Sequence, residues 1–92
     1  MIGGFADEEA ERIFHRKPSR RYGALHKIIL RKLLMLHAAQ VIGDLSHPPG
    51  NRLEPLRGNR KGQHSVRVND QYRICFVWKE PYAYKIEIAD YH

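Results

Sequence analysis

The sequence has a single cysteine, no long apolar run and fewer acidic than basic residues. One cysteine, Cys75, excludes an intramolecular disulfide and favours a reducing compartment. The apolar stretches are far shorter than the roughly 20 residues of a membrane-spanning helix. The first residues lack the basic-then-apolar pattern of a signal peptide. We therefore expect a soluble cytoplasmic protein with no membrane partner.

The length and the charge distribution indicate how many domains the protein has and what kind of partner it binds. We expect one domain over residues 1–92, helical over 1–45 and built on a sheet over 52–92, because 92 residues leave little room for a second core. The net charge is +6, and residues 46–79 hold seven Lys/Arg against two Asp/Glu. A concentrated positive charge is typical of nucleic-acid binding, although charge alone fits any anionic partner.

The first half of the chain has helical periodicity. Asp7 can cap a short helix with an acidic first turn, which Pro18 and Ser19 end. A longer helix is predicted from about Gly23 to Gln40, with an apolar stripe that only Lys32 interrupts. The segment 46–50 is rich in proline and is predicted to be a loop.

After residue 50 the apolar period changes from 3.6 to 2, as in strands. Residues 53–56 contain a proline and predict an edge strand at most. Apolar residues alternate over 65–68 and 72–78, and Tyr84, Ile86 and Ile88 continue the alternation. We expect an α+β fold in which two N-terminal helices pack on one face of a mainly antiparallel sheet of three to four strands.

The turn between residues 68 and 72 decides where the basic side chains lie. A two-residue loop would mix apolar and basic residues on both faces of the hairpin. A three-residue loop, Asn69 to Gln71, pairs Arg67 with Arg73 and gives one apolar and one basic face. We predict the second register, which leaves Arg67 and Arg73 open to a ligand on the face away from the helices.

The chain holds candidates for metal-independent RNA cleavage. That reaction needs a base for the ribose 2′-OH, an acid for the 5′-oxygen and cations for the phosphorane. Basic side chains on the sheet and the terminal Tyr91-His92 pair are candidates. The six histidines are scattered and no cysteine pair is present, so neither a metal site nor a cofactor is predicted.

Three motifs together are specific: L-R-G-N-R-K-G-Q, N-D-Q-Y-R and the final D-Y-H. With the flanking residues from 50 onward, they make the sequence resemble the HigB toxins, which belong to the RelE-like superfamily. The resemblance implies a ribosome-dependent mRNA endoribonuclease that needs no metal and inhibits translation and growth. Attack by the 2′-OH would leave a cyclic phosphate and a 5′-OH. It also implies a HigA-type antitoxin, a helix-turn-helix dimer, with operator DNA bound only through the toxin–antitoxin complex.

The resemblance also implies roles for individual residues. Arg73 would contact the scissile phosphate, His92 would be the acid–base residue, and Tyr91 would help to position the substrate. Asp90 and Arg57 match the family positions before the terminal pair and in the P-L-R-G element. Around them we expect RNA contacts from Arg52, Arg60, Lys61, His64, Arg67, Asn69 and Gln71.

Glu54 stands where some relatives carry histidine, so it is either the base or an ion-pair partner of Arg57. Other residues also have simpler explanations. The basic face could be merely solvated, His92 a frayed end and Tyr91 a packing residue, while His64 could make a structural hydrogen bond. Cys75 is expected to be a packing residue.

Two other functions remain open. A toxin of the same fold could bind a protein target such as gyrase, or it could block the ribosome without cutting RNA.

Overall fold

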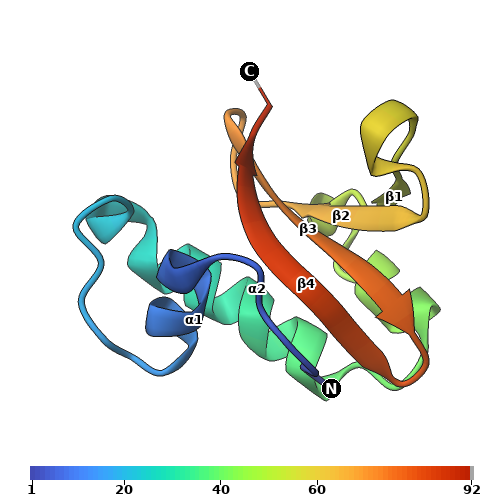
Figure 1. Cartoon of the computed structure of the whole chain (residues 1–92), viewed down its shortest axis with the longest axis horizontal. Helices are drawn as coiled ribbons and strands as arrows, with labels where there is room; N and C mark the ends of the chain where they lie inside the picture. The colour runs from blue at the N-terminus through green and yellow to red at the C-terminus, as the bar shows by residue number, and fades with distance from the viewer. Residues whose placement is uncertain (92) are drawn as a thin grey trace.

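The computed structural model describes residues 1–91 and confirms the α+β fold. Two helices lie on one side of a four-stranded antiparallel sheet of order β1-β2-β3-β4 (Figure 1). The helices are α1 (Glu8–Phe14) and α2 (His26–Ala38), and the strands are β1 (Glu54–Pro55), β2 (Gln63–Arg67), β3 (Tyr72–Lys79) and β4 (Tyr82–Asp90). In the part of the chain that the structure describes, no helix is long and apolar enough to cross a bilayer.

Asp7 caps α1 as predicted and also fastens the helix to the sheet. Its Oδ1 accepts a hydrogen bond from the Glu9 backbone N–H at 2.9 Å, and its Oδ2 accepts one from the Ile88 N–H at 3.1 Å. The helix ends at Phe14, earlier than Pro18 and Ser19, which were predicted to end it. The chain turns at Arg16, whose φ of 60° lies in the left-handed region that closes helices.

Helix α2 is shorter than the predicted 23–40, because residues Gly23–Leu25 form a 3₁₀ turn and Ala39 is extended. Its apolar stripe is buried, and Lys32 within that stripe is only 7% exposed. The segment 46–50 was predicted to be a loop, and it joins two short 3₁₀ helices that overlap only its ends. The first, η2 (Ile42–Ser46), ends at its first residue, and the second, η3 (Pro49–Asn51), begins at Pro49.

The β2–β3 turn has the predicted three-residue register. Arg67 pairs with Arg73, and the Val68 N–H donates to the Tyr72 carbonyl at 2.9 Å. The Asn69 side chain fixes this turn, since its Oδ1 accepts from the backbone N–H groups of Gln71 and Tyr72 at 2.9 and 2.7 Å. Arg67 and Arg73 therefore share one face of the sheet.

A β-bulge in β4 changes the predicted alternation. Cys75 pairs with Glu87 and Val77 with Tyr84, so one residue of β3 faces two residues of β4, Lys85 and Ile86. Tyr84 therefore shares a face with Val77, and the prediction that it lies with Ile86 and Ile88 in the core is wrong. Lys85 has a φ of 53°, which L side chains rarely adopt.

The sheet has one covered face and one open face. On the covered face, Ile74, Phe76 and Ile86 join the helix residues Ile29 and Leu33 in one buried cluster. The N-terminal segment extends the sheet, because Ile2 and Phe5 form parallel bridges with Ala83 and Ile86 along β4 (Figure 1). The open face carries the cross-strand partners Gln63, Ser65, Arg67, Arg73, Cys75, Val77, Lys79, Tyr82, Tyr84, Glu87 and Ala89.

Candidate RNA-cleaving site

A depression of about 460 Å³ lies at one end of the open face, where the β2–β3 turn meets the end of β4. We call it the arginine cleft. Three strands and two connecting segments bring its residues together, although the chain separates them by up to 39 positions. It is lined by Arg52, Glu54, Arg67, Asn69, Asp70, Arg73 and Tyr91, of which only Asp70 was not predicted as a site residue.

Arg73 is fixed by the protein around it. Its Nε donates to the Ser65 hydroxyl at 2.6 Å, and its Nη2 donates to the carbonyl oxygens of Arg52 and Ser65. Only 12% of the side chain is exposed, so Arg73 is less open than the register predicted. Within residues 1–91, its Nη1 has no hydrogen-bond acceptor, and this part of the guanidinium remains available to a phosphate oxygen.

Glu54 lies beside Arg73 and not beside Arg57. Its carboxylate is 3.7 Å from the Arg73 Nε, and about half of the side chain is exposed. The predicted alternative, an ion pair with Arg57, is not formed among the described residues. Arg57 is exposed just before the 3₁₀ helix η4 (Gly58–Arg60), outside the residues that line the arginine cleft.

The β2–β3 turn supplies a second cation and its counter-ion. Arg67 forms an ion pair with Asp70 at 2.5 Å, and the Asp70 side chain is fully exposed. An exposed pair of this kind contributes little stability, so an incoming phosphate can displace Asp70 at small cost. Asn69 is held in the turn by the backbone contacts described above.

Tyr91 is positioned by both its backbone and its side chain. Its N–H donates to the Gln71 carbonyl at 2.6 Å, and its hydroxyl accepts from the Cys75 Sγ at 3.8 Å. Burial, and secondarily the Cys75 contact, raises the pKa of Tyr91. The hydroxyl therefore stays protonated near neutral pH and can donate to a substrate. Cys75 is completely buried beneath the open face, as predicted for a packing residue.

Arg60 spans the open face from η4 to β4. It forms an ion pair with Glu87 at 2.5 Å and donates to the Gln63 side chain at 3.2 Å. The hydrogen bond to Glu87 raises the pKa of Arg60. Arg60 thus lies next to the cleft, whereas Lys61 is exposed in the turn that follows.

The remaining predicted residues lie elsewhere. His64 pairs with Phe76 and stacks on its ring at 6.3 Å, so it faces the covered side of the sheet and not the arginine cleft. Gln71 donates to the Asp90 carboxylate at 3.1 Å next to the cleft. His92 lies outside the described residues. Ser65, which holds Arg73, was missed, although its alternation with Arg67 places it on the same face.

Solved structures share this fold. Superposition on YafQ from E. coli strain BL21(DE3) gives a TM-score of 0.62 at 11% identity, covering 98% of this chain and 93% of YafQ. The YoeB–YefM complex from Staphylococcus aureus gives 0.57 at 16% identity, covering 100% of this chain and 98% of that one. These similarities define the class of the fold, a small α+β domain with helices on one side of an antiparallel sheet.

Sequence comparison then identifies the family. A model described as "RelE-like toxin of type II toxin-antitoxin system HigB" matches residues 4–92, so the chain belongs to this family. It is 50% identical over 60 residues to Toxin HigB-1 of Vibrio cholerae, covering 65% of this chain and 63% of that protein. It is 34% identical over 61 residues to Endoribonuclease HigB of Proteus vulgaris, covering 66% and 65%. The alignments thus span less than two thirds of either relative.

Proposed function

We propose that the protein is the toxin of a type II toxin–antitoxin pair and cuts mRNA in the ribosomal A site without a metal. One observation supports this most: Arg73, Arg67 and Arg52 line one cleft with a carboxylate, Glu54, beside the most rigid of the three. An arginine guanidinium can bind phosphate through two parallel N–H···O hydrogen bonds, and a carboxylate can accept a proton. RNA cleavage is also the activity for which the Proteus vulgaris relative, Endoribonuclease HigB, is named.

In the proposed reaction, Glu54 takes the proton of the 2′-OH, and the 2′-oxygen attacks the adjacent phosphorus. Arg73, through its Nη1, stabilises the charge on the phosphorane. The bond from phosphorus to the 5′-oxygen breaks as His92 donates a proton to that oxygen. The products are a 2′,3′-cyclic phosphate and a 5′-OH. Tyr91 donates a hydrogen bond that orients the substrate.

The test compares Arg73→Ala with Arg31→Ala, which removes an equal charge from the exposed side of α2. Cleavage of mRNA on programmed ribosomes is followed by primer extension, and folding by circular dichroism. Loss of a donor to the transition state lowers the rate about 10²- to 10³-fold. We expect this loss for Arg73→Ala and wild-type cleavage for Arg31→Ala. Undiminished cleavage by a folded Arg73→Ala protein would refute the assignment.

Two further variants test the proton transfers. Glu54→Gln keeps the shape of the side chain but cannot accept the proton, and His92→Ala removes the proposed acid. Both should bind ribosomes and leave mRNA uncut. DNA damage with intact mRNA in induced cells would instead indicate a protein target such as gyrase, and translation arrest with intact mRNA would indicate a ribosome blocker.

The family implies an antitoxin, and we propose that it is a small dimeric helix-turn-helix protein of the HigA type. The toxin would reach operator DNA only through that complex. A helix-turn-helix protein encoded beside this chain, and its co-purification with the chain, would support the proposal; co-purification with an unrelated antitoxin class would contradict it.

A further inference from the structure

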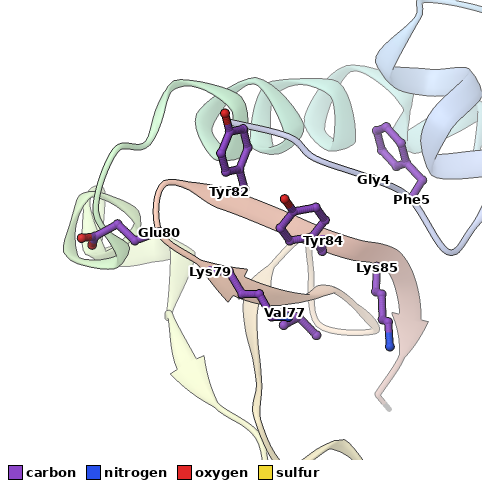
Figure 2. A pocket seen from close by; sticks show the side chains of 8 residues that line it. All are labelled: Gly4, Phe5, Val77, Lys79, Glu80, Tyr82, Tyr84 and Lys85. Atoms are coloured by element: carbon purple, nitrogen blue, oxygen red, sulfur yellow. The ribbon is translucent and has the colours of Figure 1, made fainter.

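The open face has a second depression, about 540 Å³ in volume, at the end far from the arginine cleft (Figure 2). It lies between the end of β3, the start of β4 and the N-terminal segment. Two tyrosines and two lysines are the principal groups that line it, together with Val77 on β3 and Phe5 on the N-terminal segment (Figure 2). We call it the tyrosine depression. The proposed chemistry of the arginine cleft uses none of these residues.

The two tyrosine rings present aromatic surface to this depression. Tyr82 and Tyr84 have ring centroids 5.9 Å apart and planes tilted by 41°. Tyr84 lies directly against the N-terminal backbone, because a Cβ at Gly3 would come within 2.5 Å of its ring. Tyr82 is one of the few exposed large hydrophobic residues of the described chain. Tyr82 therefore has a ring available for stacking by a planar ligand, and Tyr84 lies beside it.

The charge around the rings suits an anionic ligand. Lys79 and Lys85 are exposed, and neither belongs to an ion pair within residues 1–91. Glu80 is the one acidic side chain in the lining, which leaves an excess of one positive charge. Lys85 is held at φ 53° in the bulge, and such strain is retained where the surroundings or function require it. The same bulge places Tyr84 on the open face.

Both depressions lie along β3 on the open face. Arg73, Cys75, Val77 and Lys79 alternate on this face, so Lys79, the cross-strand partner of Tyr82, lies about 20 Å from Arg73 at roughly 3.3 Å per residue. About three to six nucleotides cover this span, because stacked nucleotides rise about 3.4 Å each and extended ones about twice as much. The Arg60–Glu87 ion pair lies on the face between the two depressions, since Glu87 pairs with Cys75, and a bound strand would pass over it.

We propose that the tyrosine depression is a second subsite for single-stranded RNA, which stacks a nucleobase about three to six nucleotides from the phosphate at Arg73. Aromatic rings flanked by lysines are the usual means of holding single strands, since every base has a π-face and every nucleotide a phosphate. The inference rests on the proposed function, because it takes the strand in the arginine cleft to be RNA.

The test measures binding of a 12-nucleotide RNA, protected from cleavage by 2′-O-methyl groups, to the full-length toxin by fluorescence anisotropy. Tyr82→Ala should weaken binding about fivefold or more, and Tyr82→Phe, which keeps the ring, should stay within about twofold of wild type. Lys79→Gln should reduce the slope of log Kd against log salt by about 0.7, the loss of one phosphate contact.

Abasic nucleotides locate the stacked base. An abasic substitution about three to six positions from the cleavage site should weaken wild-type binding as much as Tyr82→Ala does. It should have no further effect in the Tyr82→Ala protein, because the same contact is already lost. The subsite would be overturned if wild type and Tyr82→Ala bound the RNA with equal affinity, or if the wild type showed no measurable binding. It would also be overturned if Tyr82→Ala impaired only the binding of the antitoxin.

The outcome separates this inference from the proposed function. Normal ribosomal cleavage with no effect of Tyr82→Ala on RNA affinity overturns the subsite and leaves the nuclease. Tyr82-dependent RNA binding by a protein that cuts no mRNA supports the subsite and overturns the nuclease.

Discussion

Asn51 connects the helical layer with the arginine cleft, and replacing it with alanine should destabilise both. Asn51 is 1% exposed. Its Oδ1 accepts from the Lys32 ammonium at 2.5 Å, and its Nδ2 donates to the carbonyls of Leu45 and His47 at 3.1 and 3.2 Å. The next residue, Arg52, supplies the carbonyl that accepts from Arg73. The Asn51 amide thus joins the segment between η2 and β1 to α2, and Arg73 binds the same segment at Arg52.

The magnitude follows from the bonds that are lost. A hydrogen bond to a charged group contributes about 1.5–3 kcal/mol and a neutral one about 0.5–1.5 kcal/mol. Asn51→Ala removes one hydrogen bond to a charged group, Lys32, and two neutral hydrogen bonds to backbone carbonyls. It also leaves the Lys32 charge buried without an acceptor. We expect the free energy of unfolding to fall by about 3–5 kcal/mol, a large part of the roughly 5–14 kcal/mol of a domain this size.

Urea unfolding followed by the fluorescence of Trp78, the only tryptophan, measures this change. Asn59→Ala removes an exposed amide in η4 and should stay within about 0.5 kcal/mol of wild type. Asn51→Asp keeps the acceptor for Lys32 but loses both N–H donors, so it separates the Lys32 bond from the two bonds to the carbonyls. Its free energy of unfolding should lie between those of wild type and Asn51→Ala. A loss below about 1 kcal/mol in Asn51→Ala would refute the reasoning.

Three further predictions concern the open face. Gly3→Ala places a Cβ 2.5 Å from the Tyr84 ring and should lower the free energy of unfolding in urea by about 1–3 kcal/mol. Gly4→Ala is the control, because no atom would lie closer than 3.9 Å to its Cβ, and it should not lower this free energy. Equal effects of the two substitutions would contradict the prediction. Lys85→Gly relieves a φ of 53° and should raise the melting temperature, whereas Lys85→Ala should not. Burial raises the pKa of Cys75, so the folded protein keeps the thiol proton that the unfolded chain releases. The stability of wild type relative to Cys75→Ala should therefore fall as the pH rises above about 8.5, the pKa of a thiol in the unfolded chain, and a flat difference would disprove it.

The sequence predicted those parts of the fold that depend on local patterns. Alternation of apolar and basic residues was enough to choose the register that pairs Arg67 with Arg73. Asp7 was identified as a cap because capping requires only a polar side chain before a helix. Tyr84 was misplaced because a bulge adds one residue without a sequence signal, and this inserts Lys85 into the alternation.

The contacts of the site were less predictable, because they depend on segments distant in the sequence. The ion pair of Glu54 with Arg73 requires β1 to pair with β2 and β2 with β3, which no local pattern shows. Lys32 was seen only as an interruption of an apolar stripe, because its partner Asn51 lies 19 residues away. His64, by contrast, could have been placed from local pattern, since it alternates with Val66 and therefore shares the covered face.

The contacts of Arg73 also determine the entropy of RNA binding. A free arginine side chain has about 2 kcal/mol of rotamer entropy to lose when it is immobilised on a ligand. In this protein Ser65 and the Arg52 carbonyl already immobilise it, so that loss occurs during folding. A phosphate therefore meets a preformed partner. Among the described residues Arg67 is held by a single exposed counter-ion, Asp70. Of the two cations that pair across the hairpin, Arg67 therefore has more rotamer entropy to lose when it binds a phosphate.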